Sequence, residues 1–486
     1  MIFNSLTFLM FLVVVVCAYW ILPRRTRLWM LFLGSITFYG FWRIEFIPLL
    51  LFSSTTDYIV AQRLHVCRKQ STRKLLLLLS LSVNLGLLFG FKYLGFFIDN
   101  VWQGLELLGI DSSPPVLNII LPLGISFYTF QTISYTIDVY RGFIKPERDY
   151  VLYSCYVMFF PQLVAGPILR AGEVISQLDQ RPQFKACDLA EGLRRILFGL
   201  FLKVVLADNL APVVDGGFSN PVEMLGALDI WTLAFLFGFQ IYFDFSAYSH
   251  IAIGSARLMG IHFPENFNFP YLSVSPREFW RRWHISLSSW IRDYLYLPLA
   301  GSTVHDRSTG GLAEAVQEKQ LPKRTTWALF LTWAIMGLWH GAAWAFVFWG
   351  LWHAGLIYVY RLSAPLRKKL PSAIRIGVGR PLTLGLVMLA WIPFRADGLS
   401  NVVGMLTHVV SPSAYVRMGL RENIYLVAAI VTLLVVIAKP AWVWIAPWLD
   451  SRPLLRLPLE TSIYAVAISL VFIFLRPIQQ FIYFQF

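Results

Sequence analysis

The sequence has little charge and little cysteine. Only 14% of its 486 residues are Asp, Glu, Lys or Arg, whereas a soluble domain carries about 25%. Hydrophobic residues make up 57% of the chain and aromatic residues 16%. This composition excludes an ordinary soluble protein, because so much apolar surface needs lipid to cover it. We therefore expect an integral membrane protein.

The motifs of several functional classes are also absent. The four cysteines are scattered, and none forms a CxxC pair or a Cys/His spacing typical of a metal site. The sequence lacks a P-loop, an HExxH motif, a Rossmann glycine fingerprint and a GxSxG elbow. We therefore expect no disulfide framework and no bound metal, and the absences argue against an ATP-driven pump, a zinc protease and the corresponding serine hydrolases.

Apolar stretches recur along the whole chain, and a membrane core of about 30 Å needs roughly 20 residues per helix. The candidate spans are residues 2–22, 28–51, 75–98, 116–137, 150–170, 193–207, 226–246, 325–345, 346–360, 382–394, 423–445 and 461–478. Several are short, so we predict about nine to twelve passes with re-entrant and interfacial helices. No long linker or repeat divides them, and residues 1–486 are predicted to form one transmembrane domain of the all-α class.

Basic residues lie in short clusters between the apolar stretches. Although the formal net charge of +14 would suit nucleic acid, such clusters are typical of cytoplasmic loops, and we expect no nucleic-acid partner. Arg24, Arg25 and Arg27 follow the first stretch, which has no basic residue before it. The positive-inside tendency then places the N-terminus outside and makes residues 2–22 a retained helix.

Residues 325–360 contain no Asp, Glu, Lys or Arg, but they do contain His340. As one helix these 36 residues would be about 54 Å long, so we predict a turn near Gly337, Gly341 or Gly350, beside a cavity. An imidazole there is a candidate catalytic base; alternatively, it hydrogen-bonds helices together. The neighbouring Trp339 is a candidate substrate contact.

A second candidate site begins at Ser275. Ser275 and Glu278 have capping-box spacing and Pro276 suits the first helical position, so a helix is predicted to start here at the membrane interface. One continuous helix would carry a polar stripe of Arg277, Arg281, His284 and Ser288.

His284 on this stripe is the second candidate catalytic residue. Arg281 and Arg282 beside it could bind the phosphates of a donor such as a coenzyme A thioester. Alternatively, the arginines anchor the helix at the cytoplasmic interface.

A third group of polar residues ends the apolar stretch 226–246. Asp244 is a candidate substrate- or donor-binding residue. A carboxylate is costly there unless it is paired, so Asp244 orients a catalytic histidine, binds a cationic group or makes structural hydrogen bonds. Tyr248 is a further candidate substrate-binding residue. His353 forms a Trp-His pair like that of His340, but 13 residues further along a continuous helix it is expected to face elsewhere and to be structural.

Five segments together carry a family resemblance: residues 121–128, 160–167, 240–249, 278–296 and 337–342. In these motifs the chain resembles the membrane-bound O-acyltransferases, specifically the bacterial branch that contains alginate O-acetyltransferases. The resemblance implies that His340 occupies the position of the catalytic histidine, that His284 occupies a second functional position, and that acetyl-CoA is the donor. The sequence departs from this branch at His250, where Asp or Glu is usual, so position 250 has no assigned role.

The resemblance further implies an O-acetyltransferase of the bacterial inner membrane that moves acetyl from cytoplasmic acetyl-CoA to hydroxyls of an exported polysaccharide such as alginate, cellulose or peptidoglycan. The implied partners are membrane lipid, a periplasmic acetyltransferase that receives the acetyl group, and the export machinery; no bound cofactor is expected. Two alternatives stay open, a D-alanyl transferase of teichoic acid and a transporter or channel with intramembrane Asp and His.

A transfer that joins a cytoplasmic donor to an external acceptor needs a route through the membrane. We predict a central tunnel that His340 and His284 both face, with their imidazoles within roughly 15 Å of each other. A water-poor tunnel would orient the substrates and limit hydrolysis of the thioester.

Overall fold

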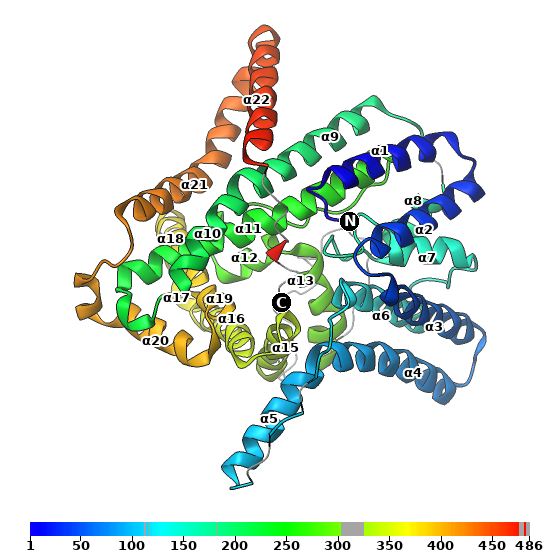
Figure 1. Cartoon of the computed structure of the whole chain (residues 1–486), viewed down its shortest axis with the longest axis horizontal. Helices are drawn as coiled ribbons and strands as arrows, with labels where there is room; N and C mark the ends of the chain where they lie inside the picture. The colour runs from blue at the N-terminus through cyan, green and yellow to red at the C-terminus, as the bar shows by residue number, and fades with distance from the viewer. Residues whose placement is uncertain (111–112, 116, 181, 303–324, 476–480, 483–486) are drawn as a thin grey trace. The chain divides into compact units, whose positions relative to one another are not determined.

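The computed structural model describes the chain except residues 111–112, 116, 181, 303–324, 476–480 and 483–486. The described residues form helices and connecting loops, and no strand occurs among them (Figure 1). This confirms the predicted all-α class. The chain divides into two compact units, Met1–Ile196 with Tyr248–Pro264, and Leu197–Ala247 with Glu265–Phe486. The single transmembrane domain over residues 1–486 stays a prediction.

The first unit is built around three packed helices, α3, α4 and α6. Its elements are α1 (Leu6–Ile21), α2 (Arg24–Gly40), η1 (Ile44–Phe46), α3 (Ile47–Val66), α4 (Gln70–Leu88), η2 (Phe89–Tyr93), α5 (Leu94–Leu107), α6 (Ile125–Arg141), α7 (Tyr150–Met158), α8 (Ala171–Asp179), most of α9 (Ala186–Leu200) and the last turns of α11 (Ala227–Arg257).

A buried carboxylate joins α3, α4 and α6. Asp57 of α3 accepts hydrogen bonds from the hydroxyl of Ser80, from Asn84 Nδ2 at 2.7 Å and from Thr136 Oγ1 at 3.2 Å. All four residues are fully buried. Polar side chains of three helices thus satisfy one another, which holds neighbouring membrane helices together.

The second unit contains the motifs that carry the candidate site. Its elements are η3 (Phe201–Ala207), α10 (Asp208–Phe218), η4 (Val222–Met224), most of α11, η5 (Pro270–Leu272), α12 (Pro276–Arg282), α13 (Ile285–Ile291), η6 (Arg292–Tyr296), α14 (Leu297–Leu299), α15 (Thr325–His340), α16 (Trp344–Leu362), α17 (Ala364–Lys368), α18 (Ser372–Ala390), α19 (Ile392–Arg395), α20 (Gly398–Val410), η8 (Pro412–Val416), α21 (Glu422–Asp450) and α22 (Pro453–Phe474).

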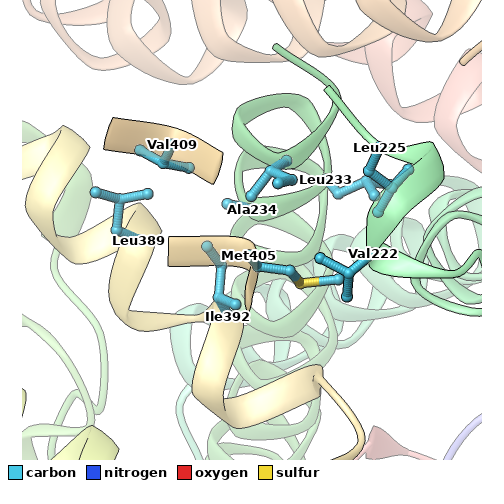
Figure 2. Close-up of a cluster of buried hydrophobic side chains, with 9 residues drawn as sticks. Val222, Leu225, Leu233, Ala234, Leu389, Ile392, Met405 and Val409 are labelled. Carbon is cyan, nitrogen blue, oxygen red and sulfur yellow. The ribbon is translucent and has the colours of Figure 1, made fainter. Parts of the chain in front are cut away.

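A cluster of buried aliphatic side chains fixes the short helix α19 in this unit (Figure 2). The cluster consists of Val222, Leu225, Ile230, Leu233, Ala234, Leu389, Ile392, Met405 and Val409. It joins η4 and the start of α11 to α18, α19 and α20. Because α19 also carries Phe394, the cluster sets the position of one wall of the candidate site.

Seven helical stretches among the described residues are long and apolar enough to cross a membrane. They are Ile44–Val66, Gln70–Leu107, Ala186–Phe218, Ala227–Arg257, Ser372–Arg395, Glu422–Asp450 and Pro453–Phe474. In α21 and α22 only 6% of the most apolar window is buried inside the protein, so these two helices need lipid around them. The chain is a multi-pass membrane protein, and the count of about nine to twelve passes stays a prediction.

Candidate active site

The apolar stretch around His340 folds as two helices. The helix α15 ends at His340 and α16 begins at Trp344. The chain reverses over residues 341–343, which confirms the predicted turn at Gly341. Gly337 and Gly350, the two other predicted break points, lie instead inside the helices.

These two glycines allow the backbones of α15 and α16 to touch. A Cβ atom added to Gly337 would overlap the carbonyl oxygen of Phe346, and one added to Gly350 would overlap the carbonyl oxygen of Trp333. Backbone atoms cannot move aside as a flexible side chain can. Small residues therefore permit this close crossing, as they commonly do between membrane helices.

The imidazole of His340 lies among three aromatic rings. Its ring centroid is 4.8 Å from that of Trp339, 4.8 Å from that of Trp349 on α16, and 5.2 Å from that of Phe394 on α19. His340 is only 4% exposed. The predicted pair of His340 and Trp339 is therefore in contact, and the surrounding rings exclude bulk water from the histidine.

The structure corrects the expectation that His353 faces away from His340. That expectation assumed a continuous helix, whereas the chain reverses between the two residues. His353 lies 4.9 Å from the ring of Trp349, so both histidines contact the same indole. His353 also accepts a hydrogen bond at Nδ1 from Trp280 Nε1, over 3.3 Å.

The segment around Ser275 begins as predicted. Ser275 Oγ accepts a hydrogen bond from the Glu278 backbone N–H at 3.1 Å, and Pro276 occupies the first turn of α12. The Glu278 carboxylate accepts a hydrogen bond from the backbone N–H of Val274 at 2.9 Å. In a capping box the donor would be the N–H of the next residue, Ser275. The start of the helix is thus confirmed.

The predicted continuous polar stripe is wrong, because the helix breaks at His284. The helix α12 ends at Arg282, α13 begins at Ile285, and His284 has a left-handed backbone with φ of 40°. Asn266 stabilises the break. Its backbone carbonyl accepts from the Ile285 N–H at 2.9 Å, and its Oδ1 accepts from Ser286 Oγ at 2.9 Å.

The break turns His284 into the protein interior. Its side chain is fully buried, with ring centroids 4.6 Å from Phe245 and 6.4 Å from Phe267. Burial lowers the pKa of His284, because a charged imidazole would lose its hydration. The ring is therefore neutral near pH 7.

The two arginines before His284 have different surroundings. Arg282 forms an ion pair with Glu278, with 2.6 Å between Nη2 and Oε1. Arg281 is exposed and forms no hydrogen bond or ion pair within the described part of the chain. The charge of Arg277 acts on Arg281, whereas Arg282 already has a carboxylate partner. A negatively charged ligand could therefore pair with Arg281 without displacing a carboxylate.

Asp244 is engaged in a buried ion pair of the second unit. Lys203 Nζ lies 2.6 Å from Asp244 Oδ1 and 2.9 Å from Asp208 Oδ1. The backbone N–H of Ile482 donates to Asp244 Oδ2 at 2.7 Å. This carboxylate therefore has a cationic partner, which the sequence reasoning required for a carboxylate in an apolar span.

Tyr248 lies on the same helix as Asp244 but belongs to the first unit. Its ring stacks on that of Phe3, with centroids 4.4 Å apart, and it is buried. Its assignment to substrate binding stays a prediction.

A continuous series of ring contacts leads from His284 to His340 inside the second unit. Phe267, which contacts His284, lies 5.2 Å from Trp283, and Trp283 lies 4.9 Å from Trp391. Trp391 in turn lies 5.6 Å from Phe394, which contacts His340. The predicted tunnel and the predicted separation of the two histidines stay predictions.

Sequence reasoning missed the rings that surround the histidines, above all Trp349 and Phe394. The chain has 18 tryptophans and 39 phenylalanines, and their spacing does not single out those that converge. No group of three His, Cys, Asp or Glu residues among the described residues could hold a metal ion.

Comparisons with known proteins identify the family of the chain. The model of the membrane-bound O-acyltransferase family matches residues 149–374. A protein named as a probable alginate O-acetylase of Azotobacter vinelandii is 39% identical, over 82% of this chain and 76% of the relative. The peptidoglycan O-acetyltransferase of Helicobacter pylori is 34% identical, over 80% and 74%. The teichoic acid D-alanyltransferase of Bacillus subtilis is 29% identical, over 57% and 68%.

Proposed function

The chain belongs to the membrane-bound O-acyltransferase family and is an O-acyltransferase, and we propose that it moves acetyl from cytoplasmic acetyl-CoA to hydroxyls of an exported cell-envelope polysaccharide. Relatives named for O-acetylation of alginate and peptidoglycan match about four fifths of the chain. The D-alanyltransferase match is weaker and shorter. The acetyl donor is therefore better supported than D-alanine.

The observation that carries the proposal is the buried imidazole of His340 at the reversal between α15 and α16. In the proposed reaction His340 takes the proton of the acceptor hydroxyl while the hydroxyl oxygen attacks the thioester carbonyl carbon. The carbon–sulfur bond breaks, and the coenzyme A thiolate leaves and receives the proton from the imidazolium. General base catalysis of this kind contributes about 10² to 10⁴ in rate.

The aromatic surroundings of His340 support the same chemistry. Trp339, Trp349 and Phe394 leave little room for water beside the imidazole. Excluding water favours transfer to the acceptor over hydrolysis of the thioester. His284, which is neutral at physiological pH, positions a substrate or assists proton transfer.

The donor docks through its phosphates at Arg281 on α12. Arg281 is exposed and lies in the positive field of Arg277, whereas Arg282 is already paired with Glu278. A phosphate group would therefore pair with Arg281 without displacing a carboxylate.

The proposal also assigns the membrane in which the chain lies and the proteins with which it acts. We assign the chain to the bacterial inner membrane, where a periplasmic acetyltransferase receives the acetyl group and the export machinery delivers the polymer. Membrane lipid surrounds the apolar helices.

The test is acetyl transfer by the purified protein in lipid nanodiscs. Radiolabelled acetyl-CoA and a D-alanyl thioester are compared as donors, each with alginate, cellulose and peptidoglycan fragments and with the periplasmic partner. We expect acceptor-dependent release of coenzyme A and label in one glycan. Transfer from the D-alanyl thioester alone would replace the acetyl assignment, and no transfer from either donor would reject the proposal.

A further inference from the structure

His353 is a buried histidine that the proposed reaction does not use. It is fully buried on α16. Four aromatic rings contact its imidazole, with centroid distances of 6.3 Å to Phe279, 4.9 Å to Trp280, 5.6 Å to Trp333 and 4.9 Å to Trp349. These rings come from α12, α15 and α16, so His353 lies where three helices meet.

The hydrogen bond with Trp280 fixes the protonation of His353. An indole N–H can only donate, so Nδ1 of His353 accepts the 3.3 Å hydrogen bond from Trp280 Nε1. The ring therefore carries its proton on Nε2. Among the described residues this Nε2 has no hydrogen-bond partner. Within the described part of the chain, the one polar contact of the side chain is thus with α12.

A group of three mutually contacting rings connects α12 to His340. The ring of His353 lies 4.9 Å from that of Trp280, the residue that directly precedes Arg281 on α12, and 4.9 Å from that of Trp349, and the two indoles lie 5.7 Å apart. The ring of Trp349 also lies 4.8 Å from that of His340. A change in the position of His353 therefore reaches both the donor-docking helix and the imidazole of the catalytic histidine.

We infer that His353 is a positioning residue that holds α12 at a fixed place relative to His340 through Trp280 and Trp349. This inference rests on the proposed function, because it needs His340 as the base and α12 as the docking site. The hydrogen-bonded pair of His353 and Trp280 lies among tightly packed aromatic rings. Because such packing has little free space, a shift of one ring displaces its neighbours. Small misplacements of reacting groups cost large factors in rate.

Four variants separate the hydrogen bond from the packing. His353→Phe keeps a ring but removes the acceptor, and Trp280→Phe keeps a ring but removes the donor. The double variant removes both partners. His353→Asn places an amide oxygen near the position of Nδ1 and can still accept from Trp280, so it serves as the rescue variant.

The measurement is kcat and the KM for acetyl-CoA in nanodiscs, expressed per folded protein from size-exclusion chromatography. We expect His353→Phe and Trp280→Phe each to lower kcat about tenfold, the double variant to lose no more than either alone, and His353→Asn to stay within about threefold of wild type.

Each other result would overturn the inference. It fails if His353→Phe keeps wild-type kcat, if the two single losses multiply in the double variant, or if only the amount of folded protein falls. A failure of the proposed function is distinct from these results, because wild-type protein would then release no coenzyme A in the same assay.

Discussion

Two buried polar sites of this protein differ in what surrounds them. In the first unit, Asp57 accepts hydrogen bonds from Ser80, Asn84 and Thr136, so neutral polar donors on two other helices hold the carboxylate. In the second unit, aromatic rings surround His340 and His353. Both sites are inaccessible to bulk water. The first is a carboxylate among polar side chains, whereas the second consists of imidazoles among aromatic side chains.

The difference teaches that burial of a polar residue is not by itself a sign of function. A carboxylate whose lone pairs are filled by neighbouring helices has its partners already, and its role is to fix helix packing. An imidazole among rings lies in a place from which water is excluded, and it can exchange a proton with a substrate that enters. The following predictions test this distinction.

The largest effect is expected at the crossing of α15 and α16. Gly350→Ala places a methyl group against the carbonyl oxygen of Trp333, so the two helices must separate and we expect most of the folded protein to be lost. Gly355→Ala in the same helix is the matched control, because nothing lies within 4 Å of its added Cβ. Size-exclusion chromatography in detergent compares the two, and equal yields would show that the helices do not need this contact.

The next effect concerns the carboxylate of the first unit. Asp57→Ala leaves buried donors of Ser80, Asn84 and Thr136 without their acceptor, so we expect about 3 kcal/mol of stability to be lost. The kcat per folded protein should stay at the wild-type value. Asp57→Asn, which keeps an accepting oxygen, should lose less. Thermal unfolding in detergent and the acetyl-transfer assay check this, and a specific loss of kcat would place Asp57 in the reaction.

A smaller effect distinguishes the two arginines of α12. Arg281→Ala should raise the KM for acetyl-CoA about tenfold while leaving kcat at saturation nearly unchanged, because phosphate contacts are made in both the ground and the transition state. Arg282→Ala should raise KM less, since its guanidinium is already paired with Glu278. Steady-state kinetics at varied acetyl-CoA provide the comparison. An unchanged KM in both variants would make both arginines interface anchors, and equal increases would show that Arg282 binds the donor as strongly as Arg281 does.

The sequence predicted much of this architecture because apolar length and charge patterns are direct consequences of the membrane. The all-α class, the start of α12 at Ser275 and the turn after His340 all follow from composition, capping chemistry and helix length. The break at His284 could not be predicted, because it depends on hydrogen bonds that Ile285 and Ser286 donate to Asn266, which lies 18 residues before His284 in the sequence.

Contacts between residues that lie far apart in the sequence could not be predicted either. Lys203 pairs with Asp244 from 41 positions away, and nothing local to Asp244 identifies that partner. Likewise, His340 and His353 meet at Trp349 only because the chain reverses at residues 341–343. The turn itself was predicted, but the ring that the two histidines then share was not.

The most direct measurement is transfer of labelled acetyl by His340→Ala beside wild type in nanodiscs. The variant should bind acetyl-CoA with wild-type affinity but transfer acetyl at least about 10² more slowly, because it lacks the general base. His65→Ala, which alters an exposed histidine of the first unit, should match wild type. Wild-type transfer by folded His340→Ala would contradict the account, because the buried imidazole among aromatic rings would then not be the base.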